Sequence, residues 1–137
     1  MHLIDPLKEI RSRLESFPEL EVTDAGSSLT VHAESEKGFD VWLSEDDSEY
    51  TVGFEGWHEH FPKQEAQAAL DCFAFGLTNS CRLRVVLRGK KEYKWVMESL
   101  ENGEWVSHST TALVFFPFWR KKTIRYLSND VLSSGHA

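Results

Sequence analysis

The chain has little cysteine, no long apolar run and no recognisable leader segment. Cys72 and Cys81 are its only two cysteines, too few for a disulfide framework and wrongly spaced for a CxxC redox or zinc motif. No window approaches the ~20 apolar residues of a membrane-spanning helix, and the first residues lack the basic stretch and apolar core of a signal peptide. We therefore expect a cytoplasmic protein with two reduced cysteines and no membrane span.

Sequence motifs for catalysis and for phosphate binding are missing as well. GxSxG, GxxxxGK and GxGxxG do not occur, so neither a hydrolase nucleophile nor a phosphate-binding loop is indicated. Ser107, His108 and Ser109 are adjacent in a strand-like run, and adjacent strand residues point to opposite faces. These absences favour a non-catalytic protein, and we expect no cofactor.

What the chain does have is a strong charge asymmetry between its two parts. Residues 1–80 carry 17 carboxylates against five Lys or Arg, whereas residues 81–137 carry five carboxylates against ten Lys or Arg. The net charge is therefore −12 in the first part and +5 in the second, which makes −7 overall. The basic part could bind an anionic partner, the acidic part a cationic one, or the two could neutralise each other. The pI of 5.3 argues against nucleic acid, for which a pI above about 9 is usual.

The spacing of apolar residues predicts a single α+β domain over residues 1–137. Asp5-Pro6 fits a helix N-cap followed by the first helical residue, and the helical spacing continues to Phe17. Pro62 begins a second helical pattern, which ends near Gly76 or Asn79. Alternating polarity predicts strands at 29–33, 39–43, 50–54, 81–88, 92–100, 104–109 and 112–116.

This pattern favours one antiparallel sheet with both helices packed on one face, in the order helix, three strands, helix, about four strands. Asn102-Gly103 is typical of a tight hairpin turn. The acidic run at residues 44–49 lacks the spaced oxygens and central glycine of a calcium-binding EF-hand loop, so it also predicts a hairpin turn. We expect flexible ends at about residues 1–4 and 129–137.

This order of elements resembles that of the secretion chaperones, small acidic proteins with a helix, three strands, a helix, further strands and a final helix. The resemblance implies a homodimer that binds segments of other proteins. The chain departs from the pattern between Trp105 and Trp119, where strand-like and aromatic sequence takes the place of the last helix.

The segment from Gly56 to Pro62 is the densest cluster of polar and aromatic residues. If a strand runs through His60, then His58 and His60 project from one face, as the two ligands of an HxH metal site do. The proline places the nearest carboxylate, Glu65, on a helix instead of a strand. Because zinc normally needs three or four well-placed ligands, we expect no metal site.

Trp57 and Phe61 flank these histidines, and we expect both rings to pack on the core while the histidines remain solvated. The alternative is a small metal-dependent or acid–base enzyme centred on His58 and His60. Such an enzyme would need a cleft and perturbed pKa values around the imidazoles.

Basic residues alternate with apolar ones after Cys81. Arg82, Arg84 and Arg88 share one face of a predicted strand, and Lys90, Lys91 and Lys94 continue the charge around the next turn. Such a stripe could bind phosphates or an acidic protein segment. We favour the other interpretation, in which cross-strand pairs with Glu92, Glu98, Glu34 or Asp40 neutralise it.

The run from Phe115 to Lys122 combines four aromatic residues with three cations. We interpret it first as a core strand that ends at Pro117, with Arg120 stacked on Trp119. Aromatic and arginine side chains are also typical of protein interfaces, which is the second interpretation. Aromatic residues and lysines are favoured at membrane surfaces, which is the third.

These observations together predict a non-catalytic module that binds a protein or a ligand. We expect a protein partner and no nucleic acid. The candidate contact residues are Trp42, Trp57, His58, His60, Arg82, Arg84, Trp119 and Arg120.

Overall fold

The first helix forms where the sequence predicts it. The computed structural model describes residues 4–132, and in it helix α1 (Pro6–Leu14) begins with the Asp5 carboxylate accepting a hydrogen bond from the Lys8 backbone N–H at 3.3 Å. Proline occupies the first helical position, where no N–H is needed. Leu7 and Ile10 are buried on the inner face of the helix. The helix ends at Leu14, three residues before the predicted end at Phe17.

A first sheet follows, with five antiparallel strands side by side in chain order. Two of its strands were not predicted. One is short and exposed, so no apolar alternation marks it. The other was predicted as a loop, but Glu55 adopts a left-handed backbone, φ 54°, and closes a hairpin. The strands are β1 (Val22–Asp24), β2 (Ser28–Val31), β3 (Val41–Glu45), β4 (Glu49–Phe54) and β5 (Trp57–Pro62).

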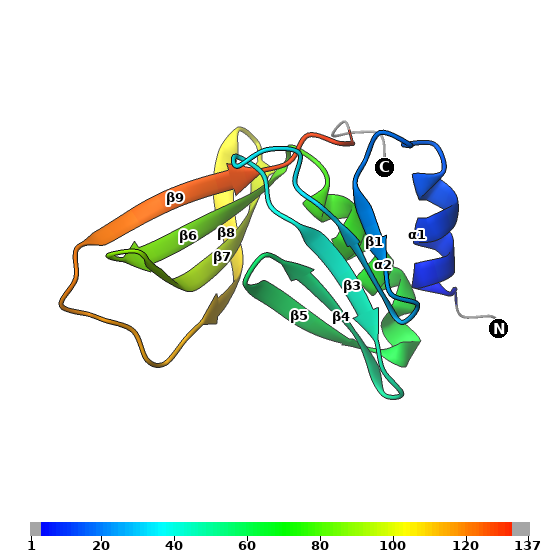
Figure 1. The fold of residues 1–137 in the computed structure, drawn as a ribbon, viewed down its shortest axis with the longest axis horizontal. Helices are drawn as coiled ribbons and strands as arrows, with labels where there is room; N and C mark the ends of the chain where they lie inside the picture. The colour runs from blue at the N-terminus through cyan, green and yellow to red at the C-terminus, as the bar shows by residue number, and fades with distance from the viewer. Residues whose placement is uncertain (1–3, 133–137) are drawn as a thin grey trace.

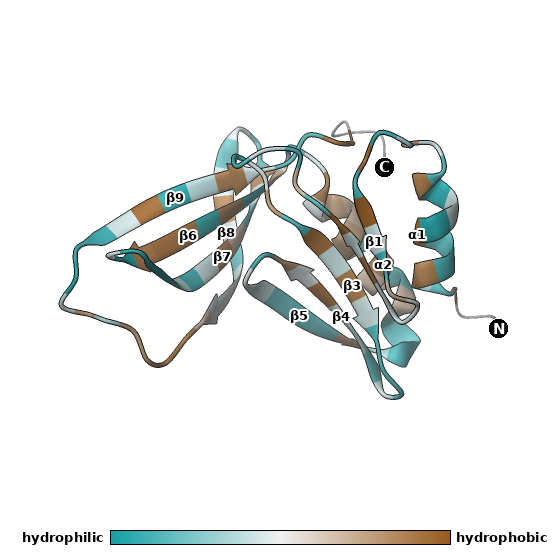
Figure 2. Ribbon diagram, viewed as in Figure 1, coloured by the Kyte–Doolittle hydropathy of each residue, from teal (hydrophilic) through white to brown (hydrophobic). Residues whose placement is uncertain are grey.

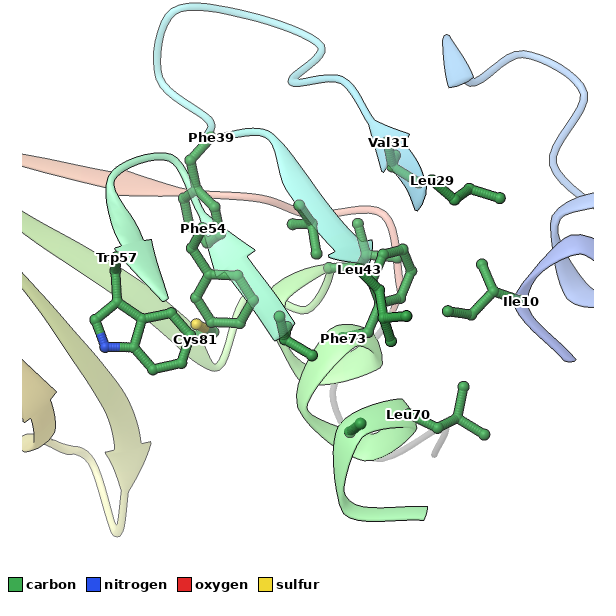
Figure 3. Close-up of a cluster of buried hydrophobic side chains, with 14 of the residues drawn as sticks. Ile10, Leu29, Val31, Phe39, Leu43, Phe54, Trp57, Leu70, Phe73 and Cys81 are labelled. Carbon is green, nitrogen blue, oxygen red and sulfur yellow. The ribbon is translucent and has the colours of Figure 1, made fainter. Parts of the chain in front are cut away.

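The second helix covers one face of this sheet, and α1 packs against the second helix (Figure 1). A short 3-10 turn, η1 (Lys63–Glu65), leads into α2 (Ala66–Gly76). The helix thus begins four residues after the predicted start, because Pro62 is the last residue of β5, and it ends at Gly76, one of the two predicted ends. A Cβ atom at Gly76 would lie 2.3 Å from the Phe54 ring, so only glycine permits this approach of helix to sheet. Leu70 and Phe73 of α2 are both buried, and in Figure 3 Phe73 lies beside Leu43 of β3 while Leu70 extends towards the side of Ile10.

The remaining strands form a second antiparallel sheet in the order β8-β7-β6-β9. The prediction of one sheet is therefore wrong, and so is the prediction of a strand at 112–116. Residues 113–121 form a loop, and the last strand lies in the basic segment after it, where only Leu127 is buried and apolar alternation is weak. The strands are β6 (Cys81–Arg88), β7 (Lys91–Glu101), β8 (Glu104–Ala112) and β9 (Lys122–Ser128).

Turns in both sheets follow the sequence prediction. Asn102 and Gly103 both have positive φ, 53° and 80°, as a tight hairpin requires. In the β3–β4 turn the Asp46 carboxylate accepts hydrogen bonds from the backbone N–H groups of Ser48 and Glu49 at 2.8 and 2.9 Å. These bonds hold the pKa of Asp46 below its ordinary value. The acidic run is thus a hairpin turn.

One apolar core continues from the first sheet into the second. Leu83, Val85 and Leu127 of the second sheet join the cluster that includes Phe54 and Trp57 (Figure 3). Cys81 belongs to this core, and burial raises the pKa of its thiol, as it raises that of Cys72 to about 12. A thiol that stays protonated is a poor nucleophile, so both cysteines serve packing.

The final helix of the secretion-chaperone pattern and the flexible chain ends were both expected from the sequence. No third α-helix occurs within residues 4–132, so this part lacks the final helix of the secretion-chaperone pattern. Residues 1–3 and 133–137 of the expected flexible ends lie outside the described residues. Val131 and Leu132, also expected in the flexible end, both donate backbone hydrogen bonds to the Leu77 carbonyl at 3.0 Å. Among the described residues no helix is long and apolar enough to cross a membrane.

Asn129 joins three parts of the chain that lie far apart in sequence. Its Oδ1 accepts a hydrogen bond from the Phe39 backbone N–H at 3.1 Å, and its Nδ2 donates to the carbonyls of Phe39 and Gly76, each at 2.9 Å. The residue is buried. One amide thus connects the end of β9, the loop before β3 and the end of α2.

Replacing Asn129 with alanine should therefore destabilise the fold. Asn129→Ala removes the partner of one buried N–H and two carbonyls, and an unpaired buried polar group costs about 1–3 kcal/mol. We expect the free energy of unfolding to fall by about 2–4 kcal/mol in urea denaturation. Asn79→Ala, at an exposed asparagine near the same helix end, is the control and should change it little. Equal stability of the two variants would contradict the role of Asn129.

The ion pair between α1 and β1 should titrate at low pH. Arg11 donates to both carboxylate oxygens of Asp24, at 2.7 and 2.9 Å, and this lowers the pKa of Asp24 from 3.8 to about 2. Because folding favours the charged form, the contribution to stability is complete above about pH 4 and is lost as the pH falls towards 2. Arg11→Gln should raise the Asp24 midpoint measured by carboxyl NMR. An unchanged midpoint would show that the pair does not form.

Candidate functional site

Trp57 belongs to the core and not to an exposed surface. Its side chain is 0% exposed, its ring stacks on Phe54 with 4.6 Å between centroids, and its Nε1 donates to Ser109 Oγ at 3.2 Å. Trp57 is thus not available to a ligand. Trp42, another predicted contact, is half-buried and lies over Gly53, where a Cβ atom would be 1.9 Å from the indole.

His58 and His60 lie on one face of β5, which runs through both of them. Their rings meet edge to face with 5.3 Å between centroids, and both residues are exposed. His60 Nδ1 lies 3.0 Å from Thr51 Oγ1 and contacts the Glu49 carboxylate. Glu65 lies on η1, away from the strand. Within residues 4–132, no three side chains of His, Cys, Asp or Glu are grouped so as to hold a metal ion.

The second sheet has one face covered by the core and one face turned away from it. Leu83 and Val85 of β6 are fully buried on the core side, so Arg82 and Arg84 between them project to the other side. The strand register places Arg82 beside Glu98 and Arg84 beside Tyr126. We call this outer surface the arginine face, and it comprises Arg82, Arg84, Arg88, Lys94, Glu98, Trp105 and Tyr126.

Arg82 is held rigidly at one end of the arginine face. Its Nε and Nη2 donate to Glu98 Oε1 at 2.8 and 2.6 Å. Its guanidinium carbon lies 4.3 Å from the centroid of the Trp105 ring and 4.1 Å from that of Tyr126. A cation between two rings gains from both ring quadrupoles. Arg82 therefore positions the two aromatic side chains and has its charge largely compensated.

Arg84 and Arg88 are not compensated in the same way. Arg84 Nε lies 3.6 Å from Glu98 Oε2, which is too long for a hydrogen bond. Within the described part of the chain, the Nε atoms of Arg84 and Arg88 are buried and have no hydrogen-bond partner. A buried donor without an acceptor is unfavourable. Because these Nε atoms are covered, a ligand would meet the rest of the guanidinium, and the Arg84 side chain is 31% exposed.

The neutralisation that the sequence predicted is only partial. Glu98 pairs with the arginines, as expected, but Glu92 pairs with Arg125 at 2.6 Å and Asp40 lies 3.4 Å from His32. Among the residues that the structure describes, no ion pair involves Glu34, Arg88 or Lys94. The arginine face thus carries more cations than carboxylates.

Trp105 and Tyr126 are the residues that sequence reasoning missed. Trp105 follows the Asn102-Gly103 turn, and the hairpin pairs it with Leu100 of β7. Because Glu98 of β7 pairs with Arg82, this hairpin could have placed Trp105 near Arg82. Tyr126 lies in β9, which was not predicted as a strand, so nothing in the sequence placed it beside β6. Comparisons with protein families, with curated proteins and with solved structures find no match.

The aromatic run after β8 does not form a core strand, so the first interpretation of it is wrong. Phe116 stacks on Tyr93 with 4.1 Å between ring centroids, but Phe115 is 88% exposed and Trp119 is 70% exposed. The pairing of β8 with β7 ends at Ala112, and Pro117 lies in the loop that follows. Arg120 packs over Gly89 and makes no cation–π contact with Trp119 in the described structure.

An apolar hollow of about 920 Å³ lies between α1, α2 and residues 131–132. Its two charged lining residues already have partners, because Arg13 donates to Glu9 and Asp71 accepts from Gln67. Specific ligand sites usually offer converging polar groups to orient the ligand. The arginine face is therefore the better candidate.

Substitutions in β5 should distinguish the buried Trp57 from the exposed His58 and His60 by their effect on stability. Trp57→Ala should lower the free energy of unfolding by about 3–5 kcal/mol, because a fully buried indole leaves a cavity. His58→Ala and His60→Ala should each change it by no more than about 0.5 kcal/mol, since both side chains are exposed. Denaturant unfolding of the three variants measures the difference. If Trp57→Ala were as stable as the wild type, the indole would not be part of the core.

Proposed function

We propose that the protein is a non-catalytic binding module that holds an acidic segment of a partner protein on the arginine face. The observation that carries this proposal is the presence of Arg84, Arg88 and Lys94 on one outward face of a sheet, without an ion-pair partner at hydrogen-bonding distance in the described residues. The carboxylate of that face, Glu98, is engaged by Arg82.

The composition of the face supports a peptide as the ligand. Arginine, tryptophan and tyrosine are the residues that contribute most often to protein-binding hot spots. Arg82 fixes the Trp105 and Tyr126 rings before any partner arrives, so little side-chain freedom is lost on binding. A carboxylate side chain can accept two hydrogen bonds from one guanidinium, which favours arginine over lysine for this purpose.

The charge of the rest of the molecule limits the size of the ligand. The first 80 residues carry a net charge of −12, counted as 17 carboxylates against five Lys or Arg. A long polyanion would extend past the arginine face and be repelled there. A short acidic segment lies within the face. The alternative enzyme centred on His58 and His60 has no comparable observation in its favour.

A defined acidic peptide tests the proposal. A fluorescein-labelled oligoglutamate peptide should bind the wild-type protein in fluorescence anisotropy, and an oligoglutamine peptide should not. Arg84→Gln combined with Lys94→Gln should weaken binding by at least about tenfold, because the face loses Lys94, which has no ion pair in the described residues, and Arg84, which shares Glu98 with Arg82. Binding should also weaken as salt rises from about 50 to 200 mM.

The matched control removes the same charge elsewhere. Lys8→Gln combined with Arg13→Gln takes one lysine and one arginine from α1, on the far side of the first sheet (Figure 1). This control should bind the peptide nearly as well as the wild type. Equal weakening by both double variants would mean that only net charge matters, and the proposal would then be wrong.

A further inference from the structure

The far end of the second sheet combines exposed apolar side chains with unopposed positive charge. Val114, Phe115, Phe118 and Trp119 are between 69% and 88% exposed. Lysines from the neighbouring β6–β7 turn lie in the same region, since the Gly89 N–H donates to the Lys121 carbonyl at 2.8 Å. We call residues 89–91 and 113–122 together the distal tip.

The distal tip contains no carboxylate. Its five cations are Lys90, Lys91, Arg120, Lys121 and Lys122. Along the chain, no Asp or Glu occurs between Glu104 and Asp130. The nearest acidic residue after the β6–β7 turn, Glu92, is occupied by Arg125 at 2.6 Å. The tip therefore carries a local excess of positive charge, which favours an anionic partner.

The exposed side chains lie on a loop that is held at both ends. At its start the Leu113 N–H donates to the Tyr93 carbonyl at 2.7 Å, and Phe116 stacks on the Tyr93 ring. At its end Arg88 Nη1 donates to the Arg120 carbonyl at 3.4 Å. Phe118 and Trp119 pack edge to face with 5.3 Å between centroids. The loop thus presents its apolar side chains outward from a defined base.

The shape and composition of the tip fit a lipid surface better than a protein. In Figure 2 the loop between β8 and β9 projects from the sheet at the end opposite α1, and brown apolar residues lie along it. Lysine is depleted in the centres of protein interfaces, whereas four of the five cations here are lysines. Aromatic rings with surrounding lysines are typical of segments at the surface of a bilayer.

The charge distribution also orients the molecule. The acidic first part of the chain forms α1, α2 and the first sheet, at the other end from the tip (Figure 1). Near an anionic surface this end is repelled and the tip attracted, so the molecule approaches tip first. From these observations we infer that the distal tip docks the protein on anionic lipid membranes, with its aromatic side chains entering the headgroup region. This inference is independent of the acidic peptide proposed for the arginine face.

Vesicle sedimentation tests the inference. The wild-type protein should sediment with vesicles of phosphatidylcholine mixed with phosphatidylserine at an ionic strength of about 0.1 M, and far less with phosphatidylcholine alone. Lys121→Gln combined with Lys122→Gln should lower the partition coefficient roughly 30-fold. A triple variant, with Phe115, Phe118 and Trp119 each changed to Ser, should lower it at least about tenfold.

Two controls make the result specific to the tip. The α1 variant Lys8→Gln with Arg13→Gln should bind the vesicles as the wild type does or better, because these residues lie at the acidic end. The aromatic triple variant should keep its thermal unfolding midpoint and its affinity for oligoglutamate, since the altered side chains are exposed and outside the arginine face. This retention shows that lost vesicle binding is not due to misfolding.

A second measurement places the indole. Phosphatidylcholine brominated in its acyl chains, mixed with phosphatidylserine, should quench part of the tryptophan fluorescence of the wild type and much less that of Trp119→Phe. No binding to the anionic vesicles, equal binding to neutral and anionic vesicles, or unchanged binding of the aromatic triple variant would overturn the inference. Oligoglutamate binding that requires the tip aromatics would also overturn it, because the tip would then be a protein-binding surface.

Discussion

The buried amide of Asn129 sets the relation between the two sheets, together with the apolar core that they share and the hydrogen bond from Trp57 to Ser109. The carbonyl of Gly76 at the end of α2 and both backbone groups of Phe39 are satisfied by this one side chain. A Cβ atom at Gly38 would lie 2.5 Å from Asn129 Oδ1, so the loop before β3 must approach closely to make these bonds. Because a hydrogen-bonded amide in a dry site has a narrow range of favourable geometries, it fixes the direction in which β9 enters the fold.

From this fixed point the surfaces of the second sheet follow. Once β9 is placed next to β6, Tyr126 stands on one side of Arg82, while the β7–β8 hairpin brings Trp105 to the other. The buried carboxylate of Glu98 then completes the arrangement from β7. The contacts of Arg82 with Trp105, Tyr126 and Glu98 thus depend on how the second sheet is joined to the first. The arginine face and the distal tip both belong to this second sheet and its loops.

The sequence predicted features that are encoded locally and missed those that are not. The Asp5 cap, the end of α2 at Gly76 and the Asn102-Gly103 turn each depend on neighbouring residues, and each was predicted. Alternation also placed the arginines of β6 on one face. In contrast, β9 has one buried residue and is recognisable only from its partner strand, so the second sheet and the pairing of Tyr126 with Arg82 could not be predicted. The aromatic loop was predicted wrongly because apolar residues ordinarily indicate a core, whereas here most of them are exposed.

In β9 the exposed side chains are separate from the one side chain that packs in the core. Of the seven residues from Lys122 to Ser128 only Leu127 is buried, and the strand is held by backbone pairing with β6. Side chains at the other positions can change without opening the core, so surface chemistry on this strand is free to diverge. Substitutions at these exposed positions therefore change what the strand presents to solvent without changing the framework that carries it.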